Sequence, residues 1–247
     1  MRRTAHRPLV IVHRGYWKQS PENSLAAVRA ALEYALDGVE IDVYCTADGV
    51  PVVMHDHEVD RTTDGNGLLA DFTLAQVRAL RLRAGEGGEG SSLSNERVPT
   101  LEEVLTLTRG RCLLCVEVKP QGIEAAILEV IRACRAEEWV WMWSFINSVV
   151  RNFRELAPRI PGAYLSDGFA SWPADRFLPE AVAIGARAVS LAWEDITPAV
   201  VAACHGMGLE VYTLAPDEPA SWDHARSAGV DALVTEDVPG LLAHWGV

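Results

Sequence analysis

The stretch VEIDVYCTADGVPVVMHD, residues 39–56, decides the fold of this 247-residue chain. It begins with alternating apolar and acidic residues, in which Val39, Ile41 and Val43 enclose Glu40 and Asp42. Alternate residues of a β-strand point to the same side, so the two carboxylates share one face. A strand covered by helices on its other face would then point both carboxylates into a protein interior.

The second half of this stretch returns toward its beginning. Only eight residues, 44–51, separate the first apolar run from the next one at 52–55, and they include the turn signal Asp48-Gly49. A crossover between parallel strands needs a dozen residues or more. We therefore predict that 44–54 forms an antiparallel ribbon, which brings His55 back to the place where Glu40 and Asp42 end.

Outside this stretch, apolar runs alternate with helical patterns. Strand-like runs lie at 9–13, 39–43, 52–55, 113–119, 140–144, 163–166, 188–191, 209–214 and 232–235. Helical patterns lie at 24–36, 100–109, 122–137, 147–156, 198–205 and 218–228. Such alternation predicts a parallel sheet with outer helices. A single α/β domain over residues 1–247, a TIM-type (β/α)8 barrel, fits the length, and the third run is the one that lies outside the eight-stranded wall.

The alternation is interrupted between residues 56 and 99. Residues 60–71 are polar, 85–95 are rich in Gly, Ser and Glu, and 73–82 has the pattern of a short amphipathic helix. We predict that 56–99 is a small insertion after strand 2 and its ribbon, and that it caps the catalytic mouth.

Charge and hydropathy limit the class of partner. The net charge of −12 disfavours nucleic acid, although a cation together with Arg14 and Lys119 could still make one pocket positive for a small anion. No apolar run approaches the roughly 20 residues of a membrane span. The basic segment 1–8 precedes an apolar run too short for a signal peptide, so we expect a soluble, cytoplasmic protein. The sequence sets no oligomeric state.

The cysteines do not form a metal or disulfide framework. They are odd in number and lie mostly in apolar or helical stretches, which predicts buried free thiols at Cys45, Cys112, Cys115, Cys134 and Cys204. The C-x-x-C spacing of Cys112 and Cys115 falls where a strand would point the two side chains to opposite faces.

Three carboxylates indicate a metal site. Glu40, Asp42 and Glu117 are hard oxygen ligands suited to one divalent cation, Mg²⁺ or Ca²⁺. Carboxylates pointing into a barrel without a cation would be costly. Two simpler interpretations stay open, namely a solvated strand face for Glu40 and Asp42, and an internal ion pair between Glu117 and Lys119.

The neighbouring side chains point to phosphodiester hydrolysis. Arg14 and Lys119 suit phosphate oxygens. His13 and His55 each end an apolar run and can exchange protons near neutral pH, as departure of an alkoxide requires. The nucleophile is either water or a hydroxyl of the substrate.

The ordered motifs resemble those of the glycerophosphodiester phosphodiesterases. They are His13-Arg14-Gly15, Pro21-Glu22-Asn23-Ser24, Glu40-x-Asp42, Val52 to Asp56, Pro99 to Glu103, Glu117-x-Lys119, Ser144-Phe145 and Gly229 to Thr235. The resemblance covers about residues 10–239. It implies a TIM-type barrel and metal-dependent hydrolysis of a small glycerophosphodiester to glycerol 3-phosphate and an alcohol.

The same resemblance implies roles for individual residues. Metal ligands map onto Glu40, Asp42 and Glu117, acid and base onto His13 and His55, and phosphate contacts onto Arg14 and Lys119. Phe145, Trp193 and Tyr212, at or just after predicted strand ends, are expected to line the glycerol pocket. Tyr212-Thr213 stands where the family usually has Trp-Thr, and Thr235-Glu236-Asp237 is one residue longer than the usual Thr-Asp.

Two alternatives remain at this stage. A phospholipase D-type hydrolase of lysophospholipid or sphingomyelin would need an apolar lip for an acyl chain, whereas residues 85–94 are largely polar. A non-catalytic barrel that binds a phosphorylated ligand would be expected to lack one of the groups named above, and all are present.

Overall fold

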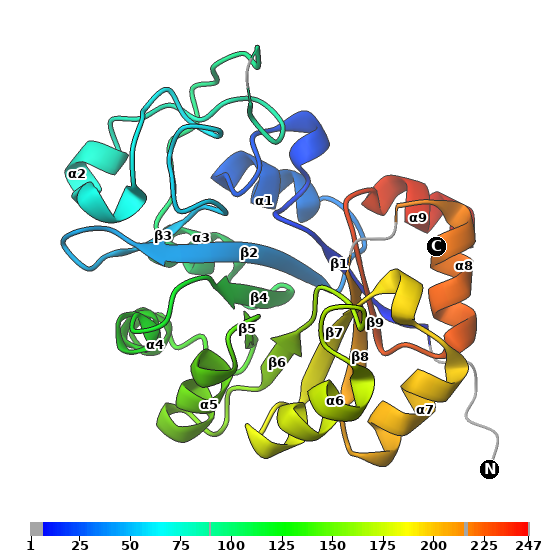
Figure 1. Cartoon of the computed structure of the whole chain (residues 1–247). Coiled ribbons are helices and arrows are strands. Elements are labelled where there is room, and N and C mark those ends of the chain that lie inside the picture. Colours follow the sequence, from blue (N-terminus) through cyan, green and yellow to red (C-terminus); the bar gives the residue numbers. More distant parts are fainter. Residues whose placement is uncertain (1–6, 89, 215–216, 247) are drawn as a thin grey trace.

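Eight parallel strands form a closed barrel in the computed structural model, which describes residues 7–88, 90–214 and 217–246 (Figure 1). The strands are β1 (Leu9–Val12), β2 (Gly38–Cys45), β4 (Leu113–Val118), β5 (Val140–Ser144), β6 (Gly162–Leu165), β7 (Ala188–Ala192), β8 (Glu210–Leu214) and β9 (Ala232–Thr235). The sheet closes because β1 pairs with both β2 and β9. The predicted TIM-type barrel is confirmed.

The strand outside the eight-stranded wall, β3, forms the predicted ribbon together with β2. β3 (Pro51–Val53) runs antiparallel to β2, with Val53 opposite Val43 and Pro51 opposite Cys45. β2 therefore extends two residues beyond the predicted run, because its last residues pair with β3 as well as continuing the barrel wall. The short loop decides this topology, since eight residues are too few for a parallel return.

Helices cover the outside of the barrel. Those expected from the sequence are α1 (Leu25–Ala31), α3 (Leu101–Thr108), α4 (Glu124–Ala133), α5 (Asn147–Leu156), α7 (Pro198–Gly206) and α8 (Pro219–Ala228). Side-chain oxygens of Ser24, Thr100 and Thr197 accept the capping hydrogen bonds that begin α1, α3 and α7. The predicted ends at residues 36 and 137 were too late, since Leu32 and Cys134 are already the final caps of α1 and α4.

Two helices were not predicted, α6 (Ala174–Ala183) and α9 (Val238–Trp245). α6 contains Pro179, a residue that normally ends a helical pattern. Both complete the β/α alternation, and Figure 1 shows them among the outer helices.

The barrel interior is filled by one side-chain row from each strand. The apolar members of this inward set are Ile11, Cys115, Trp143, Ala163, Leu165, Ala188, Tyr212, Ala232 and Val234. Glu40 and Asp42 belong to the same face, because Glu40 lies beside Cys115 in the register of β2 and β4. Polar residues thus replace the apolar filling at the carboxyl ends of β2 and β4, which is where barrel enzymes carry their sites.

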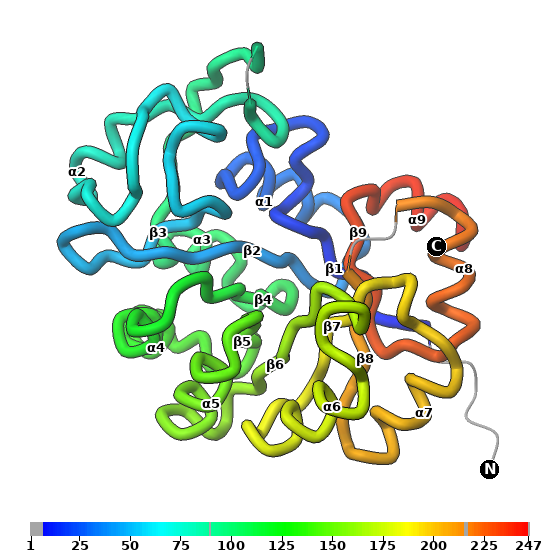
Figure 2. The backbone as a smooth tube through the Cα atoms, viewed as in Figure 1, coloured from blue at the N-terminus to red at the C-terminus, as the bar shows by residue number. Residues whose placement is uncertain are grey.

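Residues 57–98 form the insertion, which Figure 2 shows beside the β2–β3 ribbon and α1. It contains the 3-10 turn η2 (Leu69–Asp71) and the one-turn helix α2 (Leu74–Val77). Its apolar residues Val59, Leu69, Val77, Leu82 and Val98 form a separate cluster with Val52 of β3 and Met54 just after it. The helix predicted at 73–82 was wrong beyond Val77. Leu82 instead pairs with Thr63 in a β-bridge and fills the cluster.

All five cysteines are free, as predicted, but the prediction that all are buried holds only for Cys112, Cys115 and Cys204, because Cys45 and Cys134 are partly exposed. Cys112 packs in the outer core and Cys115 inside the barrel, so the C-x-x-C pair does point to opposite faces. Within the described residues, no helix combines the length and apolar character that a bilayer crossing requires. Most of the basic segment 1–8 lies outside the described residues.

Candidate active site

Three acidic side chains converge at the carboxyl ends of β2 and β4. Asp42 and Glu117 are direct neighbours in the parallel register, and Glu40 precedes Asp42 on the same face. Glu40, Asp42 and Glu117 offer carboxylate oxygens that all lie within 4.8 Å of one another. Their exposed fractions are 2%, 0% and 6%, which rules out the solvated strand face.

The arrangement fits a hard divalent cation. Oε1 of Glu40 is buried and has no hydrogen-bond partner among the described residues. A buried, unpartnered carboxylate oxygen is costly unless an ion or another donor completes it. The donor set is all oxygen, as Mg²⁺ and Ca²⁺ prefer.

The positive side chains of Lys119 and Arg14 partly compensate the negative charge of the three carboxylates. Nζ of Lys119 lies 2.6 Å from Oε1 of Glu117 and 2.9 Å from Oδ1 of Asp42. The backbone N–H of Arg14 donates to Oε2 of Glu40 at 2.9 Å, and its Nε lies 3.5 Å from Oδ2 of Asp42. The ion pair between Glu117 and Lys119 is therefore present, but Lys119 is shared with Asp42.

The pKa shifts reflect three buried acids beside two bases. Burial, and then the charge of Asp42, raise the pKa of Glu40 to about 8. Burial would also raise the pKa of Asp42, but the charges of Lys119 and Arg14 outweigh it and lower that pKa. Without a further cation, the site therefore disfavours a charged Glu40.

Asn23 holds Asp42 from the side of α1. Its Nδ2 donates to Oδ2 of Asp42 at 2.7 Å, and its Oδ1 accepts from the backbone N–H of Asp42 at 3.1 Å. Asn23 and Arg14 both have left-handed backbones, with φ of 55° and 54°. Such strained conformations in residues other than glycine collect at functional sites. The motif residue Asn23 is therefore in direct contact with Asp42.

Each candidate catalytic histidine binds a carboxylate through Nδ1. Nδ1 of His13 lies 3.2 Å from Oε1 of Glu236, and Nδ1 of His55 lies 2.6 Å from Oδ1 of Asp56. Because an ionised carboxylate only accepts hydrogen bonds, Nδ1 is the protonated nitrogen. Nε2 is then free to exchange a proton with a ligand, and in His13 it lies 4.0 Å from Oε2 of Glu40.

The pKa values of the two histidines are shifted in opposite directions. Burial lowers the pKa of His13, but the hydrogen bond with Glu236 and the charge of Glu40 outweigh it and raise that pKa. Burial is the largest cause for His55, and its pKa is lowered despite the charge of Asp42. Glu236 was not among the predicted site residues. Its only signal in the sequence was the extra residue between Thr235 and Asp237.

The three aromatic candidates occupy different places. Phe145 continues the inward row of β5 beyond Trp143, at the same end of the barrel as the carboxylates. Trp193 lies in the 3-10 turn η3 (Trp193–Asp195) after β7, with its ring edge-on to His224.

Tyr212 differs from the other two aromatic candidates in the position of its polar group. It does point into the barrel, but its hydroxyl donates to Oε2 of Glu210, the first residue of β8. Its ring packs on Trp141 and Trp143. The hydroxyl of Tyr212 therefore lies toward the amino end of β8, away from the carboxyl ends of β2 and β4 where the three carboxylates converge.

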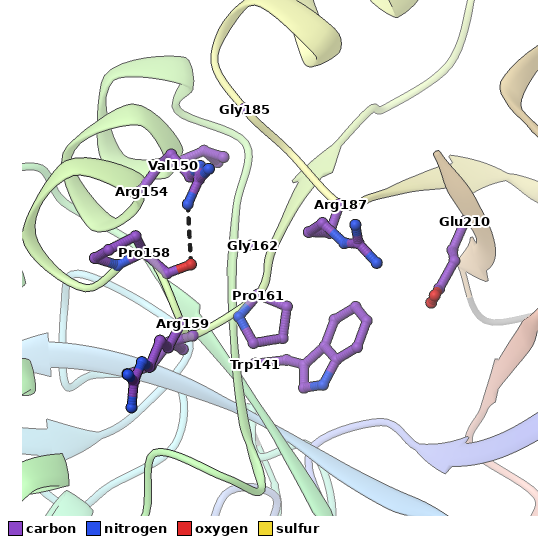
Figure 3. A pocket seen from close by; sticks show the side chains of 11 residues that line it. Trp141, Val150, Arg154, Pro158, Arg159, Pro161, Gly162, Gly185, Arg187 and Glu210 are labelled. Atoms are coloured by element: carbon purple, nitrogen blue, oxygen red, sulfur yellow. Dashed lines mark hydrogen bonds between the residues drawn. The ribbon is translucent and has the colours of Figure 1, made fainter. Parts of the chain in front are cut away.

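A cavity of about 520 Å³ lies at that opposite end of the barrel (Figure 3). Its walls include Trp141, Arg187 and Glu210 near the beginnings of β5, β7 and β8, and Arg154, which donates to the carbonyl of Pro158. Arg154 and Arg187 are exposed. This end of a barrel contributes to stability rather than to catalysis.

Comparison with known proteins agrees with the geometry. The glycerophosphoryl diester phosphodiesterase family matches residues 13–239. The glycerophosphodiester phosphodiesterase of Caldanaerobacter subterraneus subsp. tengcongensis is 35% identical over 243 residues, which are 95% of this chain and 96% of that protein.

Solved structures show the same barrel. A phosphodiesterase of Oleispira antarctica, in complex with the product sn-glycerol-3-phosphate, superposes with a TM-score of 0.85 at 26% identity and 97% coverage of both chains. The glycerophosphodiester phosphodiesterase of Agrobacterium tumefaciens gives 0.80 at 26% identity, covering 96% of this chain and 99% of that one. The chain therefore belongs to the glycerophosphoryl diester phosphodiesterase family and is a phosphoric diester hydrolase.

Proposed function

We propose that the protein hydrolyses water-soluble glycerophosphodiesters to glycerol 3-phosphate and an alcohol, with one divalent cation held by Glu40, Asp42 and Glu117. The observation that carries this proposal is the convergence of the three buried carboxylates within 4.8 Å. The product bound in the Oleispira relative supports the choice of product. Membership of a hydrolase family leaves no support for a non-catalytic barrel.

The chain's own residues would bind and orient the phosphate. Lys119 and Arg14 lie at the rim of the acidic cluster and supply fixed positive charge for phosphate oxygens. A bound cation would supply electrostatic stabilisation of charge that develops on the phosphate. Phe145, at the same end of the barrel, offers an apolar wall for the glycerol carbons.

His13 and His55 would move the protons. Each presents Nε2 with Nδ1 fixed by a carboxylate, an arrangement that holds both the tautomer and the ring orientation. One histidine would take the proton from the nucleophile, which is water or the 2-hydroxyl of glycerol. The other would protonate the departing alkoxide.

Removal of the cation is expected to abolish turnover. Purified protein should release glycerol 3-phosphate from glycerophosphocholine, and thorough chelation should lower the rate by roughly 1,000-fold, as several kcal/mol of charge stabilisation implies. Adding back Mg²⁺ and Ca²⁺ separately should restore the rate and identify the preferred ion. Circular dichroism of the chelated protein checks that the fold persists. Full turnover after complete metal removal would contradict the metal assignment.

The deacylated substrate is expected to be preferred over a lysophospholipid. An acyl chain gains about 0.8 kcal/mol for each CH₂ group that it buries, but the insertion offers mainly polar surface. Its exposed large apolar residues, within the described part, are Leu68 and Leu93. The measurement compares kcat/KM on glycerophosphocholine and on lysophosphatidylcholine below its micellar concentration. A higher kcat/KM for the lysolipid would favour the phospholipase D-type alternative, with Leu68 and Leu93 as the residues that would contact the acyl chain.

A further inference from the structure

Arg61 is a charged residue of the insertion that the proposed mechanism does not use. It follows β3 by eight residues, and its side chain is 31% exposed. Nε and Nη2 donate to the two oxygens of Asp56 at 2.6 and 3.1 Å. Nη2 and Nη1 donate to the two oxygens of Glu22 at 2.7 and 3.2 Å. Nη1 also donates to the carbonyl of Glu86.

These contacts use every N–H of the guanidinium. An arginine side chain has five N–H donors in a planar fork, and five hydrogen bonds are present. A group whose donors are all held by the protein is not placed to bind a substrate phosphate. Lysine, with three donors on a single nitrogen, could not hold two carboxylates in this bidentate manner.

Both carboxylates that Arg61 holds also contact proposed site residues. Asp56 is the partner of Nδ1 of His55 at 2.6 Å. Glu22, only 2% exposed, accepts from Nη1 of Arg14 at 3.1 Å. Arg61 is thus the middle member of a continuous chain of charged groups from His55 through Asp56 and Glu22 to Arg14.

The backbone around Arg61 ties the insertion to the barrel at the same place. The N–H of Gly88 donates to the carbonyl of Arg61 at 2.7 Å, and the N–H of Glu22 donates to the carbonyl of Gly85 at 2.8 Å. Gly87 has a φ of 76°, and a Cβ there would collide with the carbonyl of Arg61. The loop 85–88 therefore packs directly on Arg61 and on the segment that carries Glu22.

We infer that Arg61 is a positioning residue for catalysis, which holds the Asp56 partner of His55 and the Glu22 partner of Arg14 in one fixed arrangement. The inference rests on the proposed function of His55 and Arg14. One side chain of the insertion would thereby order groups on two barrel loops. Loss of Arg61 would leave the buried Glu22 with one cation instead of two and would release Asp56 to rotate.

The test uses Arg61→Lys, with Arg81→Lys as the matched control. Arg81 belongs to the same insertion and also pairs with an aspartate, Asp64, at 3.0 Å. Arg61→Lys should lower kcat on glycerophosphocholine roughly 10- to 100-fold, as loss of supporting contacts typically does, with little change in KM. Arg81→Lys should match the wild type. An increase in KM alone, or equal losses in both variants, would overturn the inference.

A double-mutant cycle and a spectroscopic readout test the route through Asp56. If Arg61 acts by holding Asp56, Arg61→Lys should add little to the loss in kcat already caused by Asp56→Asn. If the double variant instead loses kcat by the product of the two single losses, the route through Asp56 is overturned. Ring ¹⁵N shifts of His55, assigned with His55→Gln, should show protonated Nδ1 in the wild type and a mixed tautomer in Arg61→Lys. An unchanged ring pattern would also overturn it. If the wild type shows no diester turnover, the proposed function fails, and the ring pattern still decides the role of Arg61.

Discussion

Glu40→Gln is expected to lower diester turnover by roughly 1,000-fold while it stabilises the metal-free protein. Turnover should fall because the substitution replaces a charged oxygen ligand and weakens the hold on the cation. Stability should rise by about 1–3 kcal/mol, since Oε1 of Glu40 is buried, lacks a partner among the described residues and lies beside two other carboxylates. Opposite effects on activity and stability are typical of functional sites.

The measurements are kcat/KM with saturating metal and urea unfolding of the chelated protein. Glu124→Gln is the matched control, because Glu124 is a similarly buried glutamate in α4 that accepts from the N–H of Gly122 and from Asn152. This control should keep its activity and lose some stability. A Glu40→Gln protein that is less stable than the chelated wild type would show that the carboxylate has a structural role.

His13→Gln and His55→Gln are expected to lower turnover of glycerophosphocholine by about 100- to 10,000-fold, the usual contribution of a general acid or base. A p-nitrophenyl ester of glycerol phosphate should separate the two roles. Nitrophenolate leaves without a proton, so the variant that lacks the acid should recover on this substrate, and the variant that lacks the base should not.

His205→Gln is the control for these variants. Nε2 of His205 lies 2.7 Å from Oδ2 of Asp231, just before β9 begins and hence at the far end of the barrel. The control should keep full activity on both substrates. Equal recovery of His13→Gln and His55→Gln on the nitrophenyl ester would contradict a division into acid and base.

The sequence predicted the parts of this fold that short-range rules control. The turn at Asp48-Gly49 and the brief connection around it determine that β3 returns antiparallel. The two-residue period of β2 places Glu40 and Asp42 on one face, and the barrel rule places that face at the mouth. The cluster of three carboxylates therefore followed from strand geometry and the order of motifs, although its residues lie on strands far apart in the chain.

The remaining features depend on contacts between distant residues or on competing local signals. Pro179 obscured α6, whose apolar face packs on the barrel despite the proline. Tyr212 shares the inward face, but the acceptor at Glu210 draws its hydroxyl to the far end, which period alone cannot indicate. The partnership of Glu236 with His13 spans 223 positions along the chain. No pattern among neighbouring residues predicts such a pair.

The separate apolar cluster of the insertion has a consequence for how this enzyme could diversify. Its members come from residues 52–98, whereas the barrel wall packs through its own clusters. Loops between these members can change in length or composition with little disturbance of the wall, provided that Arg61 keeps its place. The insertion can therefore be varied, by evolution or by a designer, as a unit that packs on an apolar core of its own.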